Sequence, residues 1–382
     1  MKNSQSDLTA DPRLTDLIES KKGFFKNKPG ARYLFLAGLM FFLMHLPIFI
    51  TATLNDLWAP MQDRISLLQD YGWWGMNLTA VPGTILFFFW MPTGIQKVFY
   101  GLLNNRVIGK SKSPDSGMDG DHPLGTFLDR FYRVYSNKAL LIICFLIVIP
   151  YSFLVLAPAN EVYIIWQTTG FFIYWYTNFF WYMVVSLEVI LALRLLICIY
   201  FFNRLFKEFH IDVRVLHPDG AGGLSPLGKF SVAIGYLIAV YGLSVVVAYL
   251  VESYVRTTEW SGIMISVPTI IITTLYLLLS PIAFFAPIGT ARRSMKEAKD
   301  QFILKISNQY ESEIDRIQQV LDSDSEVIEE KISKLVSLQE LYTITIKFPI
   351  WPLNSENIVR FTSSILSPLF FGILSIVLEK LL

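Results

Sequence analysis

Long apolar runs alternate with short polar segments along most of the chain, and this pattern predicts a series of membrane-spanning helices. A helix that crosses a bilayer needs about 20 consecutive apolar residues. Runs of this kind lie at 31–54, 75–102, 139–158, 162–206, 230–251, 262–288 and 358–378. We therefore expect an all-α polytopic integral membrane protein with six or seven transmembrane helices.

The run at 162–206 is too long for one ordinary span and allows two interpretations. At ~1.5 Å per residue, one continuous helix here would extend past both faces of a ~30 Å hydrocarbon core. The alternative is a hairpin or a re-entrant segment. A single crossing puts the basic loops at 103–138 and 207–229 on the same side, as the positive-inside rule requires. We therefore favour one long helix, with both loops and the N-terminus in the cytoplasm.

Residues 291–347 show a different periodicity, in which apolar residues recur at steps of three and four. Such stripes are typical of amphipathic helices. The two stripes are Ile303, Ile306, Tyr310, Ile314, Ile317 and Leu321, followed by Ile328, Ile332, Leu335, Leu338 and Tyr342. Between them, Ser323 and Glu326 fit a capping box. We expect a cytoplasmic helical hairpin whose stripes pack on each other, on the 207–229 loop or on a second subunit.

These patterns divide the chain into four parts. Residues 1–30 form a cytoplasmic N-terminal segment, and residues 31–290 form the transmembrane core. The amphipathic hairpin at 291–347 follows. Residues 348–382 contain an interfacial segment and a C-terminal transmembrane or membrane-embedded helix. The first apolar run is longer than the core of a signal peptide, so we expect it to be retained as an anchor.

The composition fits the membrane class. The chain is 53% hydrophobic and only 16% charged, whereas soluble domains carry about 25% charged residues. The net charge of +1 gives no reason to expect nucleic acid as a partner. The expected partners are the lipid bilayer and, as an open alternative, further copies of the chain. Cys144 and Cys198 lie in apolar runs, and we interpret them as packing residues.

The most punctuated polar stretch reads "LHPDGAGGLSPLGKF" and occupies residues 216–230. Its glycines permit positive φ, and successive backbone N–H groups in such a loop can bind an anion. The stretch matches neither a phosphate-binding P-loop nor a dinucleotide fingerprint. Two interpretations stay open, a ligand-binding loop and a turn that starts the next helix. In the first, the binding residues are His217, Asp219, Gly220, Gly222 and Gly223.

A second loop, "DGDHPLG" at 119–125, shares a His-Pro pair with the first. Imidazole and carboxylate groups are suitable ligands for divalent metals. If the two loops lie on one membrane face, they supply a speculative metal site with Asp121, His122, His217 and Asp219 as ligands and Asp119 beside them. The alternative is that both His-Pro pairs are plain turns, since no ligand spacing on a regular element supports the site.

Glu188 and Arg194 lie within the fourth apolar run. A charged side chain inside a membrane is energetically costly, so each such residue is a candidate functional residue. Six positions apart, the two side chains differ by about 120° around a helix and do not face one direction. Either each faces the bundle interior, or both lie near the cytoplasmic interface with Arg194 snorkelling. We interpret His45, in the first span, as a packing histidine.

No catalytic residue and no cofactor follow from the sequence, because it contains no Ser-His-Asp, His-Glu-x-x-His or Cys-x-x-Cys pattern. The "HPDGAGGL" loop together with the late "FPIWPLN" resembles bacterial polytopic membrane proteins of unassigned function, which implies the bacterial inner membrane and no activity. The leading interpretation is a pore-like or signal-coupling protein with cytoplasmic loops as input. The alternatives are a secondary transporter that uses Glu188 and Arg194, and a membrane-embedded enzyme that uses the Asp/His loops.

Overall fold

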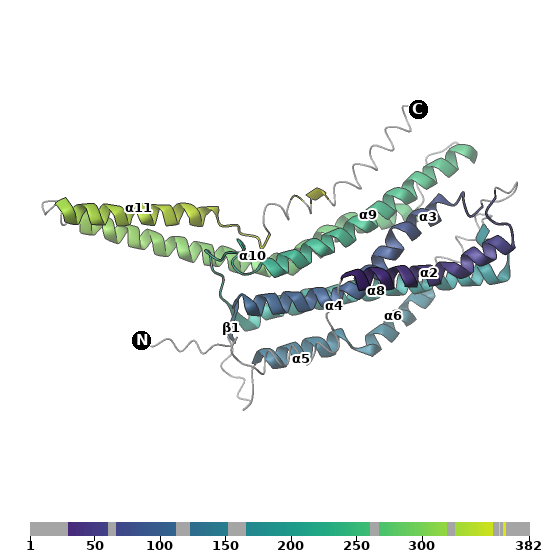
Figure 1. Cartoon of the computed structure of the whole chain (residues 1–382), viewed down its shortest axis with the longest axis horizontal. Coiled ribbons are helices and arrows are strands. Elements are labelled where there is room, and N and C mark those ends of the chain that lie inside the picture. Colours follow the sequence, from purple (N-terminus) through teal and green to yellow (C-terminus); the bar gives the residue numbers. More distant parts are fainter. Residues whose placement is uncertain are drawn as a thin grey trace.

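The computed structural model describes residues 30–59, 66–111, 123–151, 166–259, 267–318 and 325–353, together with 359 and 362–363. These residues form an elongated helical assembly (Figure 1). In chain order the elements are α2 (Gly30–Leu54), α3 (Tyr71–Leu78), α4 (Ala80–Asn104), β1 (Ile108–Ser111), α5 (Pro123–Tyr135), α6 (Lys138–Tyr151), η3 (Trp166–Thr168), α8 (Phe171–Glu208), β2 (Phe209–Ile211), α9 (Ser225–Glu259), α10 (Val267–Gln318) and α11 (Ser325–Lys347).

Five helical segments of the described chain are long and apolar enough to cross a membrane. They are Tyr33–Leu54, Trp73–Asn104, Pro123–Ile149, Phe171–Glu208 and Ser225–Ser244. This indicates a multi-pass membrane protein. The predicted run at 262–288 is helical from Val267 onward, and most of the run at 358–378 lies outside the described residues. A total of six or seven spans therefore stays a prediction.

Large apolar side chains cover the outside of the bundle at the end away from the two strands. They include Leu34, Phe35, Phe42 and Leu43 on α2, Ile142, Leu146 and Ile147 on α6, and Phe171, Phe172 and Phe179 on α8. A surface of this extent would be unfavourable in water. It is the surface that contacts lipid, and we call it the lipid-facing band.

The helix α8 runs without a break for 38 residues, which corresponds to about 57 Å at ~1.5 Å per residue. The single-helix interpretation of the fourth apolar run is thus confirmed from Phe171 to Glu208. The strands that follow α4 and α8 pair antiparallel, with Ile108 opposite Ile211. This small sheet was not predicted. It fixes the ends of α4 and α8 on the same side of the bundle, as the charge pattern had indicated.

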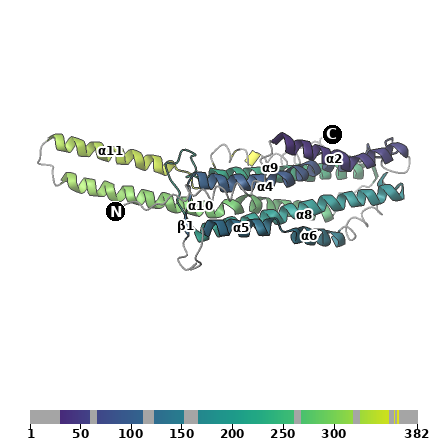
Figure 2. The same ribbon diagram turned by 60° about the horizontal axis from the view of Figure 1, so that its bottom comes forward.

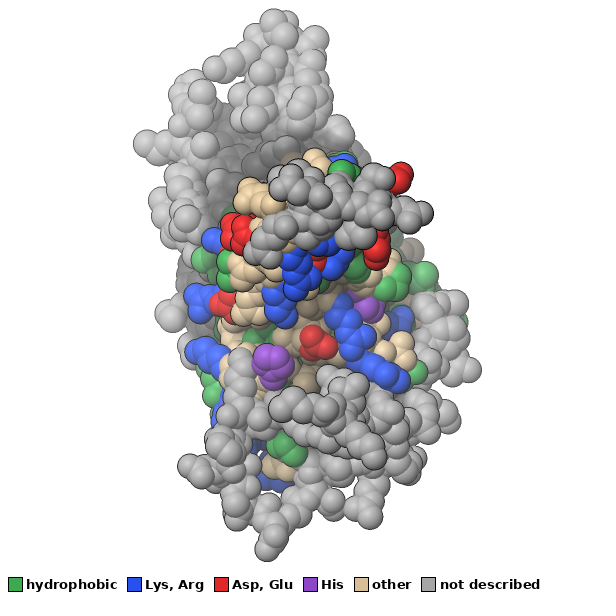
Figure 3. All heavy atoms as spheres, turned by 90° about the vertical axis from the view of Figure 1, so that its left-hand side faces the viewer, with side chains coloured by type: hydrophobic (Ala, Val, Ile, Leu, Met, Phe, Trp, Pro, Cys, Tyr) green, Lys and Arg blue, Asp and Glu red, His purple; other side chains and the backbone are tan. Residues whose placement is uncertain are grey.

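The strand-bearing end of the bundle has a core of its own. Phe99 on α4, Phe131 on α5 and Phe202 on α8 are all buried there, together with Phe230 on α9 and Phe284 on α10. The helices α4, α8, α9 and α10 lie side by side at this end (Figure 2), and in Figure 1 α9 diverges from α4 and α8 towards the other end. Seen from this end, the described surface carries many Lys and Arg side chains (Figure 3).

The helix α10 is 52 residues long and crosses residue 290, the predicted end of the membrane core, without interruption. Its second half projects from the bundle, and α11 returns antiparallel along it (Figure 1). We call α10 from residue 291 onward, together with α11, the arm. The turn at 319–324, which contains part of the predicted capping box, lies outside the described residues.

The faces that pack inside the arm differ in part from the predicted stripes. Ile306 and Leu338 are buried as expected, whereas Ile332 is 50% exposed and Tyr342 is 40% exposed. The inward face of α11 keeps Leu335 and Leu338 from the predicted stripe and continues through Leu341 and Thr345. Contact with α10 selects this face, and Ile332 and Tyr342 lie beside it.

Candidate functional site

The loop between β2 and α9 is organised around the carboxylate of Asp219. The backbone N–H groups of Ala221 and Gly223 each donate to Oδ1 at 2.9 Å, and that of Ser225 donates to Oδ2 at 3.2 Å. The Nδ1 atom of His217 lies 2.8 Å from Oδ1. The carboxylate therefore satisfies donors in the loop and at the start of α9, where helical N–H groups have no backbone partner.

The pKa of Asp219 reflects this arrangement. Burial alone would raise it, but the N–H groups of Gly223, Ala221 and Ser225 and the ring of His217 stabilise the ionised form and hold the pKa below its ordinary value. The glycine-rich loop does form a concave set of N–H donors, as such sequences can. Its occupant is the chain's own carboxylate, which leaves these donors unavailable to an external anion.

Both the backbone conformation of the loop and the lack of space for a side chain require glycine at these positions. Gly220, Gly222 and Gly223 have φ values of 65°, 65° and 90°, which other residues rarely adopt. A Cβ on Gly222 would lie 3.1 Å from Cζ of Phe348, and one on Gly223 would lie 2.4 Å from Cγ2 of Val107. The loop is thus packed between the end of α4 and the segment that follows α11.

That segment, residues 348–353, connects the arm to the bundle, and we call it the strap. A Cβ on Gly228, in the first turn of α9, would lie 1.8 Å from the carbonyl oxygen of Pro352. The strap backbone therefore lies directly on α9. The guanidinium of Arg292, at the root of the arm, lies 4.7 Å from the ring centroid of Trp351, a cation–π contact.

Polar contacts tie α11 to α10 at both ends of the arm. Near the root, Nζ of Lys299 donates to the carbonyl oxygens of Ile346 at 2.5 Å and Phe348 at 2.9 Å. Near the tip, buried Glu313 is paired with Lys334 across the hairpin. The hydrogen bond from Lys334 lowers the pKa of Glu313. The arm is therefore held by a mixed seam of apolar and ionic contacts.

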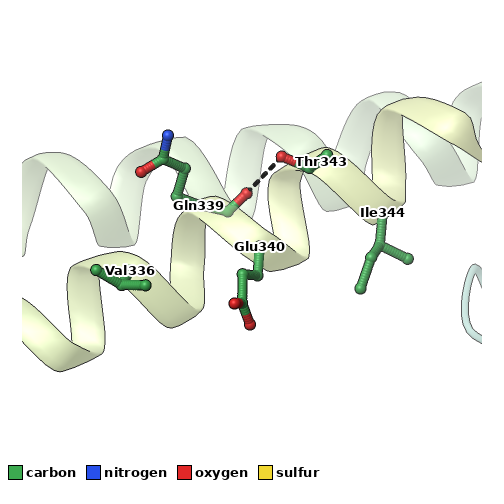
Figure 4. A pocket seen from close by; sticks show the side chains of 5 residues that line it. All are labelled: Val336, Gln339, Glu340, Thr343 and Ile344. Atoms are coloured by element: carbon green, nitrogen blue, oxygen red, sulfur yellow. Dashed lines mark hydrogen bonds between the residues drawn. The ribbon is translucent and has the colours of Figure 1, made fainter.

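The outer side of α11 carries a shallow groove. It is lined by Val336, Gln339, Glu340, Thr343 and Ile344. Figure 4 shows Glu340 and Ile344 pointing to one side of the helix and Gln339 to the other. The hydroxyl of Thr343 donates to the carbonyl oxygen of Gln339 at 2.9 Å. The groove is open, and its lining brings together no acid–base pair or nucleophile.

Glu188 lies where α4, α8 and α9 meet. Its carboxyl group lies beside the hydroxyl groups of Thr84 and Tyr241, and those two hydroxyl groups are hydrogen-bonded to each other at 2.5 Å. Thr84 is fully buried, and Glu188 is partly buried in the isolated chain. The sequence singled out Glu188 but gave no means of finding its partners.

Arg194 faces a different part of the bundle. Its guanidinium lies 4.7 Å from the ring centroid of Phe88 and 5.2 Å from that of Tyr135. Tyr135 is the last residue of α5, one turn before the basic start of α6 at Lys138. The structure therefore separates Glu188 from Arg194, as their spacing along a helix predicted, and the two do not form an ion pair.

The proposed metal site is not assembled by the described residues. Asp119, Asp121 and His122 lie outside them. Within the described ranges, no group of three or more His, Cys, Asp or Glu side chains is placed to hold a metal ion. His217 and Asp219 do come together, but the oxygens of Asp219 already accept the loop N–H groups.

His45 agrees with its interpretation as a packing residue. It is 1% exposed, and its ring nitrogens lie 2.7 Å from the carbonyl oxygen of Phe41 and 2.8 Å from Oδ1 of Asn77. The role of the strap was missed in the sequence, although its two prolines and Trp351 marked an irregular segment. No family model matches the chain, and neither a curated protein nor a solved structure matches it.

Proposed function

We propose that this multi-pass membrane protein is a signal-coupling protein, in which the arm passes a change at its surface to the membrane helices. The observation that carries this proposal is the strap. It follows α11 directly, lies on the first turn of α9 at Gly228, contacts the loop at Gly222 and packs on Arg292 of α10. A displacement of the arm relative to the bundle must therefore disturb α9 and the loop together.

The construction of the arm supports transmission over its whole length. The helix α10 is continuous from the bundle to the tip, and Lys299 and Glu313 join α11 to it. At the root, the hydroxyl of Thr290 donates to Oδ1 of Asn203 on α8 at 3.1 Å. Pro281 and Pro287 lie just inside the bundle, and proline is the usual cause of a helix kink. Bending at these prolines is the motion that we expect.

The proposed orientation places the arm, the loop and the small sheet in the cytoplasm. Basic residues concentrate at this end of the described chain, and cytoplasmic loops of membrane proteins carry an excess of Lys and Arg. They include Arg106, Arg204, Lys207, Arg214, Lys229, Arg292 and Arg293. The resemblance of the "HPDGAGGL" and "WPLN" motifs to bacterial polytopic membrane proteins supports an inner-membrane location, with the N-terminus cytoplasmic.

Hydrogen exchange of the full chain in lipid nanodiscs tests the coupling. Trp351→Ala removes the strap's contact with Arg292, and Tyr342→Ala removes an aromatic side chain from the exposed side of α11. Coupling predicts faster exchange in the loop and in the first turns of α9 for Trp351→Ala, and unchanged exchange there for Tyr342→Ala. If Trp351→Ala speeds exchange only within the strap, the arm and the bundle are not coupled through it.

A secondary transporter is the second candidate function. The observation that favours it is the position of Glu188 between three helices of the bundle, α4, α8 and α9, because intramembrane carboxyl groups often mark an ion path. Arg194 has no part in this version, since its guanidinium faces Phe88 and Tyr135. Substrate-dependent charge or proton movement in proteoliposomes, lost in Glu188→Gln, would favour transport over signal coupling.

A further inference from the structure

Three polar side chains from three helices meet inside the bundle. They are Thr84 of α4, Glu188 of α8 and Tyr241 of α9; the two hydroxyl oxygens are 2.5 Å apart, and the carboxyl group of Glu188 lies beside both. We propose that this cluster is a proton-binding site, in which Glu188 is a neutral acid in a closed ring of three hydrogen bonds. The inference goes beyond the function proposed above and holds whether or not the arm is coupled to the bundle.

Counting hydrogens in the ring supports the proposal. Three contacts, namely Thr84 with Tyr241, Tyr241 with Glu188 and Glu188 with Thr84, need three hydrogens if each is to be a hydrogen bond. The two hydroxyl groups supply two. An ionised carboxylate only accepts, so one contact would then join two oxygens with no hydrogen between them. A proton on Glu188 closes the ring, with Glu188 donating to Thr84, Thr84 to Tyr241 and Tyr241 to Glu188.

The surroundings of Glu188 favour the neutral form for a second reason. An isolated carboxylate is very costly in an apolar medium unless it is paired with a cation. Within the described residues Glu188 forms no ion pair, and the nearest basic residue along α8, Arg194, lies about 9 Å further along the helix axis at ~1.5 Å per residue. Arg194 also faces two aromatic rings instead of the carboxyl group.

Two titratable groups on the neighbouring helices α2 and α6, His45 and Cys144, do not supply the missing charge. His45 of α2 is bonded to Phe41 and Asn77. Cys144 of α6 is buried and uncharged as a thiol. A metal ion is a poor alternative occupant, because the three side chains offer four oxygens, whereas Ca²⁺ takes about six to eight. The chemistry of the cluster therefore fits a proton.

Release of this proton would change how the helices are joined. The ionised cluster holds one hydrogen fewer, so at least one of the three contacts must open or admit water. Each contact joins a different pair among α4, α8 and α9. Protonation is thus expected to draw the three helices together at this level, and deprotonation to loosen them.

Infrared spectroscopy of the full chain in lipid nanodiscs tests the proposal. At pH about 7, where solvent-exposed carboxyl groups are ionised, we expect the carbonyl-stretch band of a protonated carboxylic acid. The band should disappear in Glu188→Gln and shift in Tyr241→Phe, which removes one hydrogen-bond donor. Glu340→Gln, which changes an exposed carboxyl group on the arm, should leave the band unchanged.

The outcome that overturns the proposal is a Glu188→Gln spectrum identical to that of the wild type in this region at pH about 7. If Glu188→Gln does not fold, Tyr241→Phe alone decides. A shifted acid band then supports the ring, and an unshifted band or none overturns it. Hydrogen exchange in Trp351→Ala is independent of these spectra, so failure here leaves the coupling proposal to its own test.

Discussion

The packing of the arm can be tested by placing one charge in two neighbouring positions of α11. Leu338 is 7% exposed and faces α10, whereas Val336, two residues earlier, is 50% exposed on the outer groove. Leu338→Asp therefore removes a buried side chain and puts a carboxylate without a partner in the seam. Val336→Asp adds the same charge to the same helix in water. The pair separates loss of packing from a change in surface charge.

The structure sets the expected magnitude. Truncation of a buried leucine costs about 2–5 kcal/mol, and an unpaired buried carboxylate adds to that cost. A loss of about 3 kcal/mol raises the open fraction of the arm by roughly 100-fold, since each 1.4 kcal/mol is a factor of about ten. Ile314→Asp and Leu335→Asp should have smaller effects, because both positions are only partly buried.

Limited trypsin digestion of inverted membrane vesicles measures this opening. When cleavage is slow relative to reclosing, its rate follows the population of the open form. We expect cleavage at Lys305, Arg316 and Lys331 to be roughly 100-fold faster in Leu338→Asp and nearly unchanged in Val336→Asp. Equal rates in wild type and Leu338→Asp would show that the arm is not a packed module. Equal acceleration in both variants would show that charge, not packing, is responsible.

Further predictions concern the loop and the topology. Gly222→Val should speed exchange in the loop while membrane insertion persists, because its Cβ would lie 2.4 Å from a side-chain carbon. Gly289→Val, with open space around its Cβ, should not. The pKa of Asp219 is lowered in the folded loop, so its carboxylate stabilises the loop at any pH above the ordinary aspartate pKa of about 3.9. This contribution is lost as the pH falls through the lowered pKa of the folded state. The protection of the loop amides, measured as their exchange rate relative to the intrinsic rate at the same pH, should therefore fall in acid, and Asp219→Asn should remove that dependence; an unchanged acid response would refute it. Reporter fusions at 115 and 219 should report cytoplasm, and one at 257 the outside. An outside result at 219 would contradict the topology.

Several features were predictable because they depend on local sequence. The charge asymmetry of the loops favoured one crossing for the fourth run, and α8 is a single helix. The glycine-rich loop has positive φ at Gly220, Gly222 and Gly223. The role of Asp219 was within reach as well, since aspartate often hydrogen-bonds to backbone N–H groups two or more residues ahead.

Other features depend on how distant elements are rotated against each other, which one sequence does not fix. Glu188 and Tyr241 are 53 positions apart (241 − 188), and their meeting requires that α8 and α9 turn these faces toward each other. Likewise, Tyr342 falls on an apolar stripe of α11 but is exposed, because contact with α10 selects Thr345 for the inward face. The periodicity of apolar residues predicts the two helices of the arm, but it does not predict how each helix is rotated about its own axis.

The rigid connection of the arm to the bundle can be measured directly as a distance distribution between two spin labels. The native thiols Cys144 and Cys198 are buried and would be replaced by alanine. New cysteines in place of exposed Glu340 on the arm and exposed His210 beside the loop carry the spin labels. The distance between the two labels is then measured in lipid nanodiscs. Coupling through the strap predicts one narrow distribution that broadens in Trp351→Ala. A broad distribution in the otherwise unchanged chain would contradict the account.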